Sequence, residues 1–131
     1  MTIGRVINIE DSMSKHVAVC RALNNCGITD IDHAVTASEG LAMIEEAISQ
    51  GNPYTLLVLD MYFPLSPRER MTQAGVYVME QLNNKGIVIP IIICSSVRLV
   101  IPEVVGCIHY NEWNGDLNAD MHEMIEKVKG L

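Results

Sequence analysis

Positive charge is scarce in this chain. Nine Lys and Arg residues stand against sixteen Asp and Glu residues, and the basic side chains form no cluster along the sequence. Because binding to a nucleic-acid backbone requires a basic surface, this composition argues against a nucleic-acid partner. The net charge of −7 at pH 7 is sufficiently explained by solubility.

The sequence also lacks a long apolar run and a paired-cysteine motif. No run approaches the length of a membrane span, and Glu10-Asp11 interrupts the first apolar run too early for a targeting segment. The four cysteines form no Cys-x-x-Cys pair, and Cys94 and Cys107 lie inside apolar runs. This pattern is typical of buried thiols in a reducing compartment and argues against a zinc site. We therefore expect a cytoplasmic protein without a membrane partner.

No internal repeat, low-complexity tract or linker interrupts the chain. With 131 residues, 49% of them hydrophobic, the sequence has the length and composition of one domain with an ordinary core. We therefore expect residues 1–131 to form a single domain.

Three apolar runs stop on oxygen-bearing side chains. The runs and their ends are Val6–Ile9 before Glu10 and Asp11, Leu56–Leu59 before Asp60, and Ile91–Cys94 before Ser95 and Ser96. Such runs predict strands buried on both faces of a parallel sheet, where ligands bind at the carboxyl ends of the strands. If the three strands are neighbours, three carboxylates and two hydroxyls meet in one small volume.

The whole pattern alternates strands with helices. Strands are predicted at Arg5–Ile9, Ile31–Val35, Thr55–Leu59, Val88–Cys94 and Val105–Tyr110. A first helix is predicted after a cap at Ser12 or Ser14, with Val17, Cys20, Leu23 and Asn24 on one helical period. Three further helices are predicted: one that begins at Ser38, one near Gly75–Asn84 and one over Asp116–Lys129. This alternation predicts an α/β fold, a doubly wound five-stranded parallel sheet of flavodoxin-like form with helices on both faces.

The adjacent acids suggest a cation site. A single acid after a strand usually caps the next helix, and that reading is open for either Glu10 or Asp11 alone. Neighbouring carboxylates raise one another's pKa, however, and a divalent cation relieves the repulsion. Mg²⁺ suits hard oxygen ligands of this kind. Asp60 is a candidate nucleophile.

The order of these motifs resembles the receiver domain of bacterial two-component response regulators. The resemblance rests on Glu10-Asp11, on Asp60 with Pro64 four residues on, on Gly75, and on Pro90 opening the run that ends in Ser95. It covers nearly the whole chain, and it is the combination of motifs, not any one of them, that is specific.

The resemblance implies a function and a set of roles. Asp60 would accept a phosphoryl group from a histidine kinase or a phosphotransfer protein. Mg²⁺ would be held by Glu10, Asp11 and Asp60 together with the main-chain carbonyl of Tyr62. Ser95, with Ser96 beside it, would bind the phosphoryl oxygens. A stand-alone receiver would pass its signal to an unidentified output protein and would not itself be an enzyme; receivers also often pair, which makes a homodimer a further expected partner.

One departure from the receiver pattern concerns charge. Receivers carry a lysine at the end of strand five, whereas Tyr110 stands at that place here. A phenol donates a hydrogen bond but cannot replace a cation. Arg68, Arg70 or Arg98 could supply the missing charge or could be surface residues. Lys15, at the start of the first helix, could also be a neighbour of the pocket, but we expect it to point to water.

Another departure concerns length. The loop from Pro64 to Gly75 is longer than in the family, and Ser66-Pro67-Arg68-Glu69 has the form of a capping box, which predicts an extra helical turn at Pro67–Gln73. The segment from Ser95 to Tyr110 is shorter, and Pro102 interrupts it, so the fourth helix is predicted to be shortened or missing. In receivers this helix belongs to the signalling face.

Two positions at the rim of the pocket bear on how long a phosphoryl group would persist. Tyr62 and Val97 offer no carboxylate or amide to orient a water, and Arg98, which follows Val97, is a further rim position. We therefore expect a phosphorylated Asp60 to be long-lived.

Alternative functions remain open at this stage. The missing lysine and altered fourth helix favour a pseudo-receiver, a protein-interaction module that works without phosphorylation. An aspartate-based phosphatase would need a second aspartate where Tyr62 stands. A nucleotide-binding flavodoxin-like protein would need glycines in the turn after Ile9, and residues 10–14 contain none.

Overall fold

A central parallel sheet organises the chain. The computed structural model describes residues 1–113 and 116–131. Its five-stranded sheet has the order β2-β1-β3-β6-β7, and every pair of neighbours is parallel. The strands are β1 Val6–Ile9, β2 Ile31–Ala34, β3 Leu56–Leu59, β6 Ile91–Ser95 and β7 Gly106–His109. The predicted doubly wound sheet is confirmed, and the three strands that end in polar groups are neighbours.

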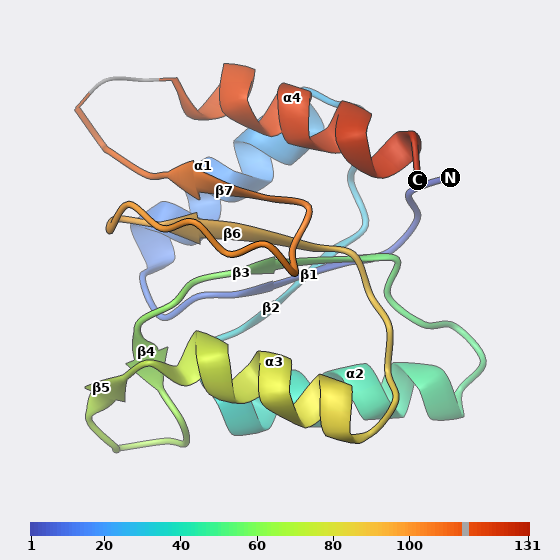
Figure 1. Ribbon diagram of the computed structural model, residues 1–131, viewed down its shortest axis with the longest axis vertical. Helices are drawn as coiled ribbons and strands as arrows, with labels where there is room; N and C mark the ends of the chain where they lie inside the picture. Colours follow the sequence, from blue (N-terminus) through green and yellow to red (C-terminus); the bar gives the residue numbers. More distant parts are fainter. Residues whose placement is uncertain (114–115) are drawn as a thin grey trace.

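Helices cover both faces of this sheet. Figure 1 shows α1 (Met13–Asn24) and α4 (Leu117–Lys129) on one face, and α2 (Ala37–Ser49) and α3 (Ala74–Asn84) on the other. The N-cap of α1 is Ser12, one of the two serines predicted for that place, whereas α2 is capped by Thr36 and not by Ser38. Among the described residues, no helix is long and apolar enough to cross a membrane.

The strands divide their side chains between two cores. Ile7, Ile9 and Leu59 pack with α2 and α3, whereas Val6 and Val58 pack with α1 and α4. This division follows from the alternation of side chains along a strand. Because apolar residues are needed on both faces, β3 is apolar throughout and β1 is apolar except for the buried Asn8. The acids Glu10 and Asp60 follow the ends of these two strands.

The long loop after β3 contains a small hairpin. Strands β4 (Phe63–Pro64) and β5 (Met71–Thr72) pair antiparallel, so the predicted helical turn at Pro67–Gln73 is wrong. Phe63 is fully buried and anchors one side of the hairpin. Arg68 has φ of +69°, a left-handed conformation that a right-handed helix excludes. The capping-box motif therefore makes a turn, in which the Glu69 amide donates to the Ser66 carbonyl oxygen.

The segment between β6 and β7 contains no helix. Residues 96–105, all of which the structure describes, form bends and turns, as the interruption at Pro102 predicts. The expectation of a shortened or missing fourth helix is confirmed. Val100, which is 96% exposed, lies in this segment.

Candidate functional site

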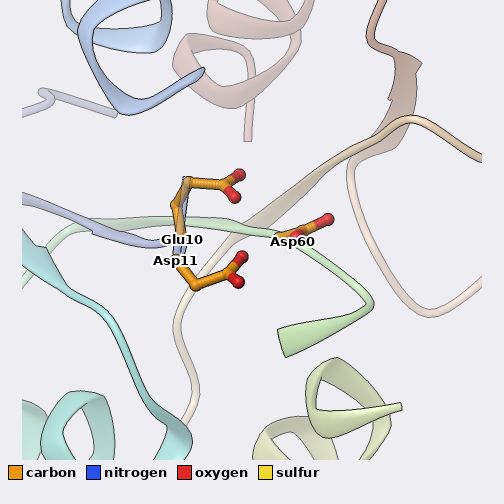
Figure 2. A group of neighbouring side chains, drawn as sticks. All are labelled: Glu10, Asp11 and Asp60. Carbon is orange, nitrogen blue, oxygen red and sulfur yellow. The ribbon is translucent and has the colours of Figure 1, made fainter. Parts of the chain in front are cut away.

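Three carboxylates converge at the carboxyl ends of β1 and β3. Ile9 is paired in register with Leu59, so the residues that follow, Glu10 and Asp60, lie side by side. One oxygen from each of Glu10, Asp11 and Asp60 lies within 4.8 Å of the others. Figure 2 shows the three side chains gathered around one space. The convergence of the three carboxylates expected from the sequence is therefore present in the structure.

A lysine lies among these acids. The Lys15 ammonium is 2.9 Å from Oε1 of Glu10 and 3.0 Å from Oδ1 of Asp60, and the residue is only 5% exposed. Its nitrogen also lies 5.4 Å from the centre of the Tyr110 ring. The expectation that Lys15 points to water is wrong.

Lys15 lies on the buried face of α1, and the helical period predicted from Val17 is wrong about this face. The buried residues of α1 are Lys15, Val19, Ala22 and Leu23. Their spacing is that of a single face of a helix. Val17, the first residue of the predicted helical period, is instead 43% exposed. A lysine in phase with a buried helical face, four residues after Asp11, is the sequence signal that points to this contact.

Backbone amides hold the two buried carboxylates in place. Oδ1 of Asp60 accepts a hydrogen bond from the Met61 amide at 2.8 Å as well as one from Lys15. Oε2 of Glu10 accepts a hydrogen bond from the Ser12 amide at 3.2 Å. Oε1 of Glu10 is buried and forms its ion pair with Lys15 without a hydrogen bond of good geometry. Among the described residues, no donor contacts Oδ2 of Asp60, which leaves that oxygen free for chemistry.

The local electrostatics favour the presence of a cation. Burial raises the pKa of Glu10 to about 7; the Lys15 ammonium acts against this rise, and the charge of Asp60 adds to it. Burial lowers the pKa of Lys15, but the charges of Glu10 and Asp60 outweigh it and leave that pKa above its ordinary value. Lys15 is therefore an ammonium ion at neutral pH.

The donor set fits a divalent cation. When ionised, the three carboxylates carry three negative charges and Lys15 carries one positive charge, so two negative charges remain uncompensated. All the carboxylate ligands are hard oxygens, which Mg²⁺ prefers. Asp11 is the more exposed of the three acids and offers a side open to solvent.

The two serine hydroxyls at the end of β6 are placed differently from one another. Ser95 is buried, and its Oγ accepts a hydrogen bond from the Val97 amide at 3.2 Å. Ser96 is exposed and lines a cavity of about 250 Å³ whose walls also include the three acids, Tyr62 and Tyr110. Larger hollows of about 470 and 500 Å³ lie elsewhere on the surface, but neither is lined by these acids.

The remaining predicted site residues lie at the edge of the acidic cavity or outside it. Tyr62 is half-buried, and Val97 is 45% exposed. Arg98 is exposed and borders a different hollow, together with Leu99 and His109. Arg68 and Arg70 are exposed on the hairpin and do not line the acidic cavity.

No protein-family model matches the sequence, and no curated protein matches it. Solved structures do match over nearly the whole chain. A CheY-like response regulator receiver domain protein from Methanospirillum hungatei JF-1 has a TM-score of 0.66 at 18% identity, over 99% of this chain and 100% of that one.

The chain has the fold of a response regulator receiver domain. A DNA-binding response regulator of the LuxR family from Staphylococcus aureus has a TM-score of 0.68 at 19% identity, over 96% of this chain and 98% of that one. A chemotaxis response regulator of Vibrio cholerae has a TM-score of 0.65 at 17% identity, over 97% of this chain and 99% of that one. At such identities the likeness concerns the receiver fold, and the chemistry must be argued from the residues of this chain.

Proposed function

We propose that this chain is a receiver in phosphorelay signalling that accepts a phosphoryl group on Asp60. The single observation that supports this most is the convergence of Glu10, Asp11 and Asp60 around one space at the carboxyl edge of the sheet. A carboxylate acts as a phosphoryl acceptor when its neighbours position the donor and neutralise charge. The cavity beside Asp60 provides room for the reacting group.

The proposed reaction is a transfer between two nucleophiles. Oδ2 of Asp60 attacks the phosphorus of a phosphohistidine on a histidine kinase or phosphotransfer protein. A phosphorus–oxygen bond forms, the phosphorus–nitrogen bond breaks, and the imidazole leaves with the electron pair and takes up a proton. Asp60 then carries an acyl phosphate. The hydrogen bonds to Oδ1 fix the carboxylate so that Oδ2 faces the donor.

The proposed metal site uses Glu10, Asp11 and Asp60, joined by the main-chain carbonyl of Tyr62. When bound there, Mg²⁺ would neutralise charge on the transferred phosphoryl group. Ser95 and Ser96 would contact the phosphoryl oxygens from the end of β6. Tyr62 and Val97 at the rim provide no group that orients an attacking water, so the acyl phosphate would persist.

The proposed output is a protein–protein interaction made in the cytoplasm by the receiver domain that residues 1–131 form. A charge change at Asp60 would bias the segment 96–105, which replaces a helix next to the site, and a partner would recognise the change. A second copy of the chain is one such partner.

A labelling experiment tests this function. The protein is incubated with acetyl phosphate and Mg²⁺, and its intact mass is measured. We expect one added phosphoryl group on the parent and none on Asp60→Asn. Asp30→Asn, in an exposed loop, is the matched control and should label like the parent. Labelling of Asp60→Asn to the parent's level would show that the acceptor assignment is wrong.

A phosphorylation-independent interaction module is the second candidate. It is favoured by Lys15, which already compensates Glu10 and Asp60, and by the exposed Val97 and Val100 where a helix would lie. The same mass spectrum separates the two candidates, because this module would gain no phosphoryl group.

A further inference from the structure

The acidic cavity depends on one side chain for positive charge. Among the described residues that line it, Lys15 is the only lysine or arginine, whereas Glu10, Asp11, Asp60 and Glu112 are acids. A phosphoryl group brings further negative charge into this space. Without a cation on the protein, such a group would meet repulsion from each of these carboxylates.

Lys15 is positioned to meet a phosphoryl group on Asp60. Its nitrogen is 3.0 Å from Oδ1 of the acceptor carboxylate, so a group bonded to Oδ2 of the same carboxylate comes within reach of the ammonium. The side chain begins in the first turn of α1, where Ser12 caps the helix by accepting from the Lys15 amide at 3.3 Å. The cap therefore fixes the backbone from which the ammonium reaches the acids.

The end of β7 contributes a ring in place of a charge. Tyr110 follows β7 and is held by its amide, which donates to the Ser95 carbonyl oxygen at 2.7 Å. Its ring faces the ammonium, with 5.4 Å between the nitrogen and the ring centre. An aromatic face stabilises a cation, so Tyr110 packs against Lys15 and helps to keep it in the cavity.

We infer that Lys15, supplied by helix α1, is the residue that neutralises the phosphoryl group on Asp60, and that Tyr110 positions its ammonium. The inference rests on the proposed function, since it needs Asp60 to be the acceptor. The positive charge at the site then comes from Lys15 in α1, whereas Tyr110, directly after β7, carries no charge. Arg68, Arg70 and Arg98 are then surface residues with no part in the transfer.

A swap of the charge between the two positions tests the inference. The rate of labelling by acetyl phosphate and Mg²⁺ is measured for Lys15→Met, for Lys15→Met/Tyr110→Lys and for Lys15→Met/Tyr110→Phe. We expect Lys15→Met to label about tenfold more slowly or worse, because a charge-assisted hydrogen bond is lost. The lysine at position 110 should restore much of the rate, and the phenylalanine should not. Lys85→Met, which removes a surface ion pair with Glu45, is the control and should label normally.

The outcomes distinguish this inference from the proposed function. Normal labelling of Lys15→Met, with the parent labelled on Asp60, overturns the role of Lys15 and leaves the acceptor intact. Failure of the parent to label on Asp60 overturns both. If Lys15→Met is slow but Lys15→Met/Tyr110→Lys is as slow while still folded, the role of Lys15 is structural and the inference is wrong.

A measurement on the parent protein covers the case in which the variants do not fold. Protein with ¹⁵N-labelled lysine is titrated with beryllofluoride and Mg²⁺, which form a phosphoryl mimic on a carboxylate. The Nζ resonance of Lys15 should shift on binding, and that of Lys85 should stay in place. A mimic that binds without moving the Lys15 resonance would overturn the inference.

Discussion

Gly75 lies directly against the backbone of Asp60, the proposed phosphoryl acceptor. A β-carbon at position 75 would come within 2.5 Å of the Asp60 carbonyl oxygen and 2.9 Å of the Met61 α-carbon. The Gly75 amide donates to the Met61 carbonyl oxygen at 3.0 Å. The first turn of α3 and the loop after β3 are therefore packed backbone against backbone, a contact that only glycine allows without displacement.

Gly75→Ala is expected to destabilise the protein and to disturb Asp60. The added methyl group meets backbone atoms that cannot rotate away, so we expect a loss of about 1–3 kcal/mol in the free energy of unfolding. Urea denaturation measures this loss. Gly4→Ala is the control, because nothing lies within 4 Å of its β-carbon, and it should be close to neutral. An unchanged midpoint for Gly75→Ala would contradict the close packing.

The stacked imidazoles of His16 and His33 should make stability depend on pH. Their ring centres are 3.6 Å apart with 5° between the planes, and Nδ1 of His16 donates to Oδ1 of the buried Asn8 at 2.7 Å. Burial lowers the pKa of His16 below 6.5, and the facing His33 lowers it further. Below pH 6.5 the unfolded chain therefore binds more protons at this residue than the folded one, and stability falls as the pH falls.

His16→Gln should reduce this loss. Denaturation midpoints between pH 7 and pH 5 measure the slope, and His122→Gln on the exposed face of α4 is the control. A slope for His16→Gln that equals the parent's would show that the stacked pair does not govern acid stability.

Tyr54 should resist ionisation in the folded protein. Burial raises the pKa of its phenol to about 12, and the hydrogen bond to Oδ2 of Asp32, 2.5 Å long, adds to the rise. The folded-state pKa lies above the ordinary value of 10, so the stability from the neutral phenol is present below pH 10 and is lost as the pH rises toward 12. Absorbance titration at alkaline pH should show one tyrosine that ionises late.

Tyr54→Phe identifies that tyrosine and measures its contribution. We expect the late transition to vanish and the free energy of unfolding at pH 7 to fall by about 1.5 kcal/mol, because a hydrogen bond to a charged group is lost. Arg5 still pairs with Asp32 at 2.9 Å and still lies over the ring, so the loss should stay small. Tyr77→Phe, at an exposed position, should leave both measurements unchanged.

Cys94 should be the least reactive of the four thiols. It is 1% exposed, and burial raises the pKa of its thiol to about 12. The thiolate is the form that reacts, so alkylation should be slow until the protein unfolds. Mass spectrometry of peptides after brief treatment with iodoacetamide checks this, with half-buried Cys20, Cys26 and Cys107 as internal references. Labelling of Cys94 as fast as that of the other three would contradict its burial.

The sheet and the acidic cluster could be predicted from the sequence, because both follow from the pattern of apolar and acidic residues within individual strands. Leu56–Leu59 is apolar at every position, and Val6–Ile9 is apolar at every position except the buried Asn8, a pattern typical of strands covered on both faces. Parallel strands place their carboxyl ends at one edge, so Glu10, Asp11 and Asp60 had to meet once β1 and β3 were neighbours.

The place of Lys15 and the shape of the loop after β3 were decided by tertiary structure. The periods of α1 allow either Val17 or Lys15 on the inner face, and only the packing of Val19, Ala22 and Leu23 against the sheet brings Lys15 to the acids. A local capping motif at Ser66 predicted a helical turn. Phe63 is instead buried in the core, and the loop that follows it forms a hairpin. In both cases contacts with residues distant in the sequence outweigh a local preference, because they bury more apolar surface and satisfy more charge than one turn of helix can.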